Sequence, residues 1–243
     1  YSDSYRLRIS SSSCSHANDA FIRMVNSLSD TSFRFFYREM TSLEVIEDIY
    51  TNRADVGFIM YPAHKEAEIQ DRLMLRHLEF HPLFRSPTQF FCRVGHPILN
   101  ERENLTPEKL YQYNFVLYPS ENTRNRAVES LYNDETLQLI NWNLVPQVIY
   151  VNSRASLHNL IQRSDYIGIG MIPVREQEEN YNIVSFPLPD WMKPEADRCG
   201  DFVAAYIHQK SSSLPKAAKA YITFLEQYYG PESGYKEKLE LKE

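Results

Sequence analysis

β-prone and amphipathic segments alternate along this chain, and the alternation constrains the fold more than any other feature of the sequence. Residues 5–10 are β-prone, and Phe21, Met24, Val25 and Leu28 then recur at the spacing of an amphipathic helix. The series continues with a β-prone stretch at 33–37, a helix at 41–50 and a buried strand at 56–61. A β-α-β-α-β order predicts parallel strands joined by right-handed crossovers.

A second series of the same kind follows two β-prone stretches at 76–84 and 89–94. Its expected strands lie at 115–118, 145–151, 167–172, 183–186 and 202–207, and a helix opened by Pro215 closes the pattern. The predicted fold class is therefore α/β, with two Rossmann-like lobes. In parallel α/β lobes of this kind, ligands bind at the carboxyl ends of the strands, so we expect a ligand between the two lobes.

Several expected helices begin with capping residues. The run Thr41-Ser-Leu-Glu44 is a capping box, in which each of the two end residues satisfies the other's backbone N–H. Thr106 precedes Pro107 at another helix start, and Asn152-Ser153 precedes the apolar stripe of 157–161. Asn18 is the expected cap of the first helix.

Several classes of site lack their sequence signature. Among the seven glycines only Gly168 and Gly170 are clustered, which disfavours phosphate loops, dinucleotide-binding turns and nucleophile elbows. The net charge of −6 is unsuited to non-specific DNA binding, which needs a cationic face. No apolar run approaches the roughly 20 residues that span a bilayer, so no membrane partner is expected. The three cysteines form no C-x-x-C pair, which favours a reduced, intracellular setting.

The histidines do not follow a metal-binding pattern. His77 and His81 are four residues apart, but they fall in a β-prone stretch where that spacing separates side chains along the strand. His64 with Glu66 and Glu68 does not form H-E-x-x-H. We therefore predict no metal site and no cofactor. No serine or cysteine has a sequence-local histidine and aspartate partner, so we predict no catalytic residue and no enzyme.

Six segments, in order and with similar spacings, resemble the effector-binding domain of LysR-type transcriptional regulators. They are Leu7–Ser10, Thr41–Gly57, Leu83–Ile98, Leu105–Leu110, Leu157–Pro173 and Pro215–Tyr228. Ser10 and Tyr166 stand where that family usually has glycine. The likeness covers nearly the whole chain.

The resemblance implies a type 2 periplasmic-binding-protein-like fold, with lobe I formed by 1–89 plus 202–243 and lobe II by 90–201. Two crossing strands, near 86–91 and 201–205, would form the hinge. The family's winged helix-turn-helix domain is absent from this chain, which opens at Tyr1, so we expect DNA binding only through that missing domain. The implied partners are a small-molecule effector and a second copy, giving a cytoplasmic homodimer, or a tetramer in the full-length regulator. In the dimer, the helix at 18–28 or the one at 124–131 is expected to meet its partner.

The expected effector is a small carboxylate, because helix N-termini carry partial positive charge. The expected contacts, from helix starts and from the family likeness, are Ser11, Ser12, Ser13, Cys14, Thr41, Ser42, Tyr61, Ser120, Asn122, Ser153, Gly170 and Met171. A plainer interpretation stands beside each: the hydroxyl and amide residues only cap helices, the serine run is a solvated loop, and the glycines serve close packing.

Two other functions fit the same fold. A transport-linked extracytoplasmic solute-binding protein would share the architecture and would need a secretion signal or lipid anchor upstream. An enzyme on the same two-lobed fold is the third, and no motif favours it.

Overall fold

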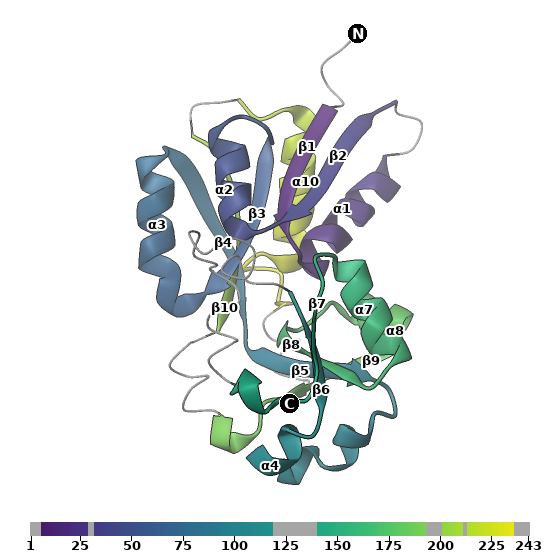
Figure 1. Cartoon of the computed structure of the whole chain (residues 1–243). Coiled ribbons are helices and arrows are strands. Elements are labelled where there is room, and N and C mark those ends of the chain that lie inside the picture. Colours follow the sequence, from purple (N-terminus) through teal and green to yellow (C-terminus); the bar gives the residue numbers. More distant parts are fainter. Residues whose placement is uncertain (1–5, 29–31, 119–139, 193–200, 211–212, 236–243) are drawn as a thin grey trace. The chain divides into compact units, whose positions relative to one another are not determined.

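A computed structural model describes residues 6–28, 32–118, 140–192, 201–210 and 213–235 (Figure 1). The chain divides into two compact units. Unit 1 consists of Tyr1–Ser86 and Val203–Glu243, and unit 2 of Pro87–Phe202. The two α/β units confirm the predicted fold class.

The sheet of unit 1 has the strand order β2-β1-β3-β10-β4. Strand β1 runs parallel to both β2 and β3, as the β-α-β-α-β pattern predicts. The elements of unit 1 are β1 (Arg6–Ser12), α1 (Ser15–Ser27), β2 (Arg34–Met40), α2 (Ser42–Tyr50), β3 (Val56–Pro62), α3 (Glu66–Leu75), β4 (Leu78–Ser86), β10 (Phe202–Gln209) and α10 (Lys216–Tyr229).

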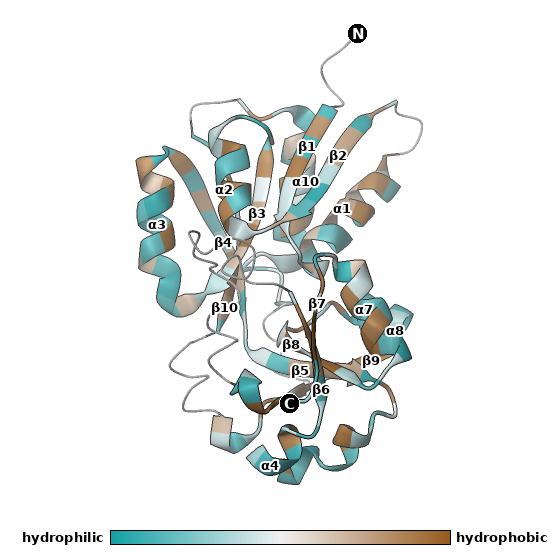
Figure 2. Ribbon diagram, viewed as in Figure 1, coloured by the Kyte–Doolittle hydropathy of each residue, from teal (hydrophilic) through white to brown (hydrophobic). Residues whose placement is uncertain are grey.

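The centre of this sheet is apolar, and one glycine sets how closely a helix packs on it. Every residue of β3 is buried, as expected for a strand covered on both faces. A Cβ atom on Gly57 would lie 2.8 Å from side-chain atoms of Val45, Ile49 and Ile207. Only glycine therefore allows α2 to lie this close to the sheet. Figure 2 shows the surface helices α1 and α3 carrying both hydrophilic and hydrophobic residues.

The sheet of unit 2 has the order β7-β6-β8-β5-β9 and is mixed. Its elements are β5 (Thr88–Arg93), α4 (Pro107–Leu110), β6 (Asn114–Leu117), β7 (Val148–Tyr150), α7 (Arg154–Arg163), β8 (Tyr166–Met171), α8 (Arg175–Tyr181) and β9 (Ile183–Pro187). Strand β6 is parallel to β7 and β8, but β5 is antiparallel to β8 and β9. An all-parallel sheet was therefore the wrong expectation here, because the chain enters the unit through β5 without a crossover helix before it.

Three expected caps are present and one is wrong. Thr41 and Glu44 form the capping box, Thr106 accepts from the N–H of Lys109, and Ser153 accepts from the N–H of Ser156. Asn18 lies inside α1, which begins at Ser15 with Cys14 as its extended N-cap residue. The apolar periodicity located the helix but not its first turn, because β1 continues through the serine run almost to the helix.

Candidate functional site

Two serines and a main-chain group meet where β1 and β3 end and α2 begins. Ser12 Oγ lies 2.7 Å from Ser42 Oγ, although the residues are 30 positions apart. Ser42 Oγ also lies 2.7 Å from the carbonyl oxygen of Met60. The Met60 N–H lies 3.3 Å from Ser12 Oγ and 3.2 Å from Ser42 Oγ. We call Ser12, Ser42 and the Met60 main chain the serine cluster.

The protons of the serine cluster have one consistent arrangement. A carbonyl oxygen only accepts, so the hydroxyl of Ser42 donates to Met60. The hydroxyl of Ser12 must then donate to Ser42. The Met60 N–H donates back to both hydroxyl oxygens. Every hydroxyl proton of the cluster is thus used inside the protein, and both serines are buried. The cluster holds three strand and helix ends together at one edge of the sheet.

The other residues of the serine run are also engaged. Ser11 is buried in β1 and donates to the carbonyl oxygen of Ser12. Ser10 is buried and donates to Asp48, whose carboxylate also pairs with Arg38 at 2.6 Å and Arg53 at 2.9 Å. The solvated-loop interpretation is therefore wrong for Ser10, Ser11 and Ser12.

Three further expected contacts lie next to this edge. Ser13 lies in the bend between β1 and α1 and is partly exposed. Cys14 is buried, and its Sγ lies 3.3 Å from Nδ1 of His16. The Thr41 hydroxyl donates to Glu44 Oε2 and accepts from the N–H of Glu44 within the capping box.

Tyr61 has a buried hydroxyl for which the described residues offer no hydrogen-bond partner. The whole residue is inaccessible to solvent, and its ring lies 6.3 Å from that of Phe80. Burial is the largest cause that raises the pKa of this phenol above its usual value, and the Glu66 carboxylate adds to it. Glu66 itself pairs with Arg85 at 2.6 Å. The hydroxyl is therefore a neutral donor without an acceptor, near the end of β3.

The expected contacts in unit 2 are less closely connected to one another than those in unit 1. Ser153 is exposed and accepts from the N–H of Ser156, at 3.5 Å. Gly170 and Met171 end β8 and pair with Gln89 and Thr88. Ser120 and Asn122 lie outside the described residues.

The nearby Gly168 serves close packing. A Cβ atom there would lie 2.1 Å from the ring of Phe91. The packing interpretation is confirmed for this glycine.

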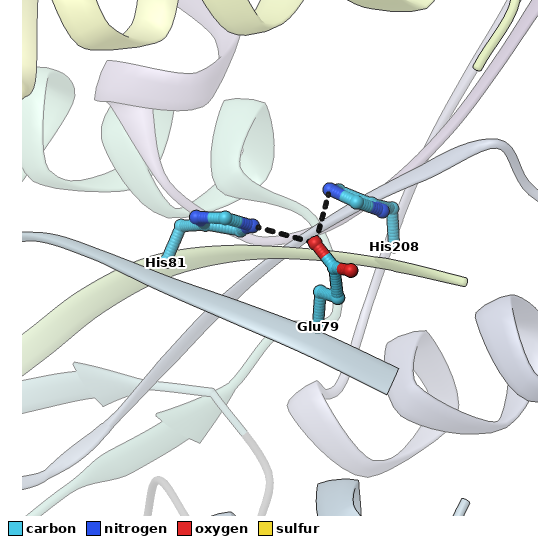
Figure 3. Close-up of side chains that lie close together, drawn as sticks. All are labelled: Glu79, His81 and His208. Atoms are coloured by element: carbon cyan, nitrogen blue, oxygen red, sulfur yellow. Dashed lines mark ion pairs between the residues drawn. The ribbon is translucent and has the colours of Figure 1, made fainter. Parts of the chain in front are cut away.

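A cluster of three polar side chains in unit 1 was not predicted from the sequence. Glu79 and His81 on β4 lie beside His208 on β10 (Figure 3). The Glu-x-His alternation places the first two on one face of a strand, which the sequence does show. The third follows 127 positions after His81, and only the sheet order brings it there.

The model of the LysR substrate binding domain family matches residues 29–230. No curated protein sequence matches the chain. Among solved structures, the chain is similar to the effector binding domain of QuiR in complex with shikimate, at 15% identity and a TM-score of 0.55, covering 92% of this chain and 96% of that one. It is also similar to the regulatory domain of MetR, a LysR family regulator from N. meningitidis, at 13% identity and a TM-score of 0.57, with 97% and 96% covered.

A mutant of full-length BenM is a further similar structure, at 13% identity and a TM-score of 0.55, with 93% of this chain and 68% of that chain covered. Within the described residues, no helix is long and apolar enough to cross a membrane. Because the family model covers most of the sequence and these structures share its fold, the chain belongs to the LysR substrate-binding domain family, whose members are regulatory domains of transcription regulators.

Proposed function

We propose that this domain senses a small carboxylate metabolite, which binds at the carboxyl edge of the unit 1 sheet and changes the geometry of a homodimer. Tyr61 is the observation that carries the proposal. Its buried hydroxyl is a donor without a partner among the described residues, and it adjoins the serine cluster in sequence. A buried unsatisfied hydroxyl costs about 1–3 kcal/mol, and a ligand oxygen that accepts from it would recover that cost.

The electrostatics of this edge favour an anion. Helices α1 and α2 both begin here, the first after β1 and the second at Ser42. Their N-terminal turns carry partial positive charge, which stabilises a carboxylate. Shikimate, bound in the similar QuiR structure, is a hydroxylated carboxylate, which supports the same ligand class for this chain.

The serine cluster has a defined part in this proposal. Since its hydroxyl protons are already donated internally, Ser12 and Ser42 can offer a ligand only lone pairs, unless a ligand displaces one of the internal bonds. Their main role is then to position the ends of β1, β3 and α2. Ser11, Ser13, Cys14 and Thr41 stay proposed contacts at this edge, and Ser120, Asn122, Ser153, Gly170 and Met171 stay proposed contacts in lobe II.

The effector regulates only if it binds one dimer arrangement better than another. Helix α1, the edge strand β2 and the residue that precedes β2 carry exposed apolar side chains that suit an interface between copies. Ile22 is 48% exposed, Phe36 62% and Phe33 37%. Phe21 of α1 packs against Phe35 and Tyr37 of β2, so the two elements are neighbours, and exposed apolar side chains on them suit an interaction surface. In the proposed regulator, lobe I is 1–89 plus 202–243, lobe II is 90–201, DNA is bound by a domain outside this sequence, and the protein acts in the cytoplasm.

Ligand binding tests the site directly. The domain is screened by thermal shift against shikimate and a panel of other small carboxylates, and hits are measured by calorimetry. Tyr61→Phe should weaken binding about tenfold, which corresponds to about 1.4 kcal/mol, and should leave the ligand-free protein at least as stable. Tyr50→Phe, at the far end of α2, is the matched control and should bind like the wild type. Equal binding by Tyr61→Phe and wild type would contradict the proposed site.

The proposed dimer interface is tested in a separate experiment, so that a negative result there does not bear on the proposed ligand site. Phe36→Glu and Ile22→Glu place charges on the proposed interface and should convert a dimer to a monomer in analytical ultracentrifugation. Met74→Glu, a 67% exposed residue on α3, is the control. If both Phe36→Glu and Ile22→Glu still form dimers, the interface lies elsewhere.

A further inference from the structure

Three possible metal ligands converge on one face of β4 and β10 in unit 1 (Figure 3). The two strands are neighbours in the sheet. The Lys210 N–H donates to the His77 carbonyl at 3.2 Å, and the ring of His81 stacks on Tyr206. In antiparallel strands, residue numbers rise along one strand as they fall along the other. His77 is next to Lys210 and His81 is next to Tyr206, so β4 and β10 are antiparallel and His208 lies opposite Glu79. We call Glu79, His81 and His208 the histidine cluster.

The separations in the histidine cluster suit a shared cation. Glu79 Oε2 lies 3.4 Å from His81 Nε2 and 3.6 Å from His208 Nε2. All three ligand atoms lie within 4.8 Å of one another. Two ligands of tetrahedral Zn²⁺, each at about 2.0–2.2 Å from the ion, are roughly 3.3–3.5 Å apart. Two of the pairs therefore already have nearly the required spacing.

With both imidazole rings neutral, one arrangement of the protons lets this cluster present three acceptors to a cation. His208 Nδ1 lies 3.0 Å from the carbonyl oxygen of Gln209 and must donate to it. In the neutral ring, Nε2 of His208 then presents a lone pair to the Glu79 carboxylate. His81 Nε2 is buried and has no hydrogen-bond partner among the described residues, so with its proton on Nδ1 this ring adds a second lone pair. Lone pairs that face one another in this way are stabilised by a cation placed between them.

The surroundings hold these ligands in place. The His208 Nδ1–H bond to a carbonyl is the outer contact that metal-bound histidines usually make. The ring of His81 stacks on Tyr206 with centroids 4.5 Å apart, and the Tyr206 hydroxyl donates to Glu226 at 2.6 Å. Although His81 Nε2 itself is buried, the side chains of His81 and Glu79 are 39% and 37% exposed, so the ligand atoms lie just below the surface of unit 1.

The histidine cluster is separate from the proposed effector site. Gln209, next to His208, donates to the carbonyls of Ile49 and Tyr50 at the last turn of α2. The serine cluster contacts the first turn of the same helix through Ser42. A nine-residue helix is about 13 Å long. The two clusters therefore contact opposite ends of α2, and they lie at the two edges of the sheet that are formed by the ends of its strands.

We propose that Glu79, His81 and His208 bind a divalent transition-metal ion of the Zn²⁺ type. Two imidazole nitrogens with one carboxylate oxygen favour zinc and its neighbours over Mg²⁺ and Ca²⁺, which prefer oxygen ligands. The ion keeps one position for water or an external ligand. It joins β10 to β4, and binding therefore stabilises unit 1.

Metal titration of the chelator-treated domain tests this proposal. The probes are Co²⁺, followed by its visible absorption, and Zn²⁺, followed by calorimetry. We expect one ion for each chain at this site. His208→Ala and Glu79→Ala should each weaken binding at least tenfold. His64→Ala and His77→Asn are matched controls and should bind like the wild type. Equal affinity in the wild type and the cluster variants would overturn the proposal, as would absence of binding to the wild type.

A second measurement remains decisive if the variants fold poorly. Nitrogen chemical shifts of the imidazole side chains are recorded on the wild-type domain with and without Zn²⁺. The chain has seven histidines, and Zn²⁺ should move the Nε2 signals of two of them. Movement of Nδ1 signals instead, or of other histidines only, would overturn the assignment.

Discussion

The two edges of the unit 1 sheet carry polar clusters of opposite character. In the serine cluster, each hydroxyl proton and the Met60 N–H have an acceptor inside the protein. In the histidine cluster, a carboxylate lies 3.4 and 3.6 Å from two ring nitrogens, and under the metal-site proposal all three groups give their lone pairs to a cation. A cluster whose donors and acceptors balance stabilises the fold by itself. A cluster of acceptors alone becomes stabilising only when a cation arrives.

Substitutions in the two clusters should therefore have different effects on stability. Substitutions in the serine cluster should change folding under all conditions, because the partners that they leave behind are buried. Substitutions in the histidine cluster should matter only when metal is present. Comparing variants with and without added metal therefore distinguishes structural from conditional residues within one sheet.

The largest expected effect breaks the balance of the serine cluster. Ser12→Ala combined with Ser42→Ala leaves the Met60 N–H without either hydroxyl acceptor. We expect the free energy of unfolding to fall by about 3 kcal/mol, since each buried unsatisfied group costs about 1–3 kcal/mol. Glu79→Gln in metal-free buffer should change it by less than about 0.5 kcal/mol. Urea denaturation of both variants measures the contrast, and similar losses would remove the distinction between the two edges.

A buried histidine in unit 2, outside both clusters, should make the stability of the protein depend on pH. His158 is buried beside Tyr181, and its Nδ1 has no partner in the described part of the chain. Burial, with a smaller contribution from Arg154, lowers its pKa from 6.5 to about 4. Between those two pH values the unfolded chain binds a proton that the folded chain does not, so stability falls as the pH falls.

The loss for this one group reaches at most about 3 kcal/mol at the acid end. His158→Leu should remove that part of the pH dependence while leaving stability at pH 7 close to wild type. Urea denaturation at a series of pH values between 7 and 4 makes the measurement. Parallel pH profiles for the variant and the wild type would show that folding does not lower the pKa of His158.

Ser153, which lies outside the serine cluster, should contribute less to the free energy of unfolding than Ser42. Ser153 caps α7 with one long, exposed hydrogen bond. Ser153→Ala should cost about 0.5–1 kcal/mol, as for an ordinary N-cap, and less than Ser42→Ala. Thermal unfolding of the two single variants ranks them. An equal cost would mean that burial adds nothing to the Ser42 hydrogen bonds.

The smallest expected effect is the coupling between the two edges. Because the length of α2, about 13 Å, separates the residues that contact the two clusters, the effects of Ser42→Ala and His208→Ala on the free energy of unfolding should add in the double variant to within about 0.5 kcal/mol. A double-mutant cycle in metal-free buffer measures this. A larger coupling energy would show that the sheet transmits changes from one edge to the other.

Local chemistry made much of the fold predictable. The Thr41–Glu44 capping box and the apolar run of β3 depend on neighbouring residues, and both were found from the sequence. The first turn of α1 was placed too late, because Cys14 is not a typical cap and Asn18 is. The reversed direction of β5 depends on how the chain enters unit 2, for which no short segment carries a signal.

The site was less predictable for the same reason. Ser12 and Ser42 were expected at a common strand edge, and the structure brings them together. That their hydroxyls satisfy each other depends on atomic distances that no periodicity encodes. The pairing of His208 with Glu79 depends on β10 lying beside β4, which is a property of the sheet order and not of either segment.

That sheet order also has a consequence for how the protein is made. Strand β10 lies between β3 and β4, yet it is encoded after the whole of unit 2. A ribosome, adding about 5–20 residues per second, releases the contiguous unit 2 before the sheet of unit 1 can be completed. Until Phe202–Gln209 emerges, β4 has no strand joining it to β3. The last core strand to be synthesised thus completes the first unit of the chain, and the histidine cluster exists only in a nascent chain that has finished that step.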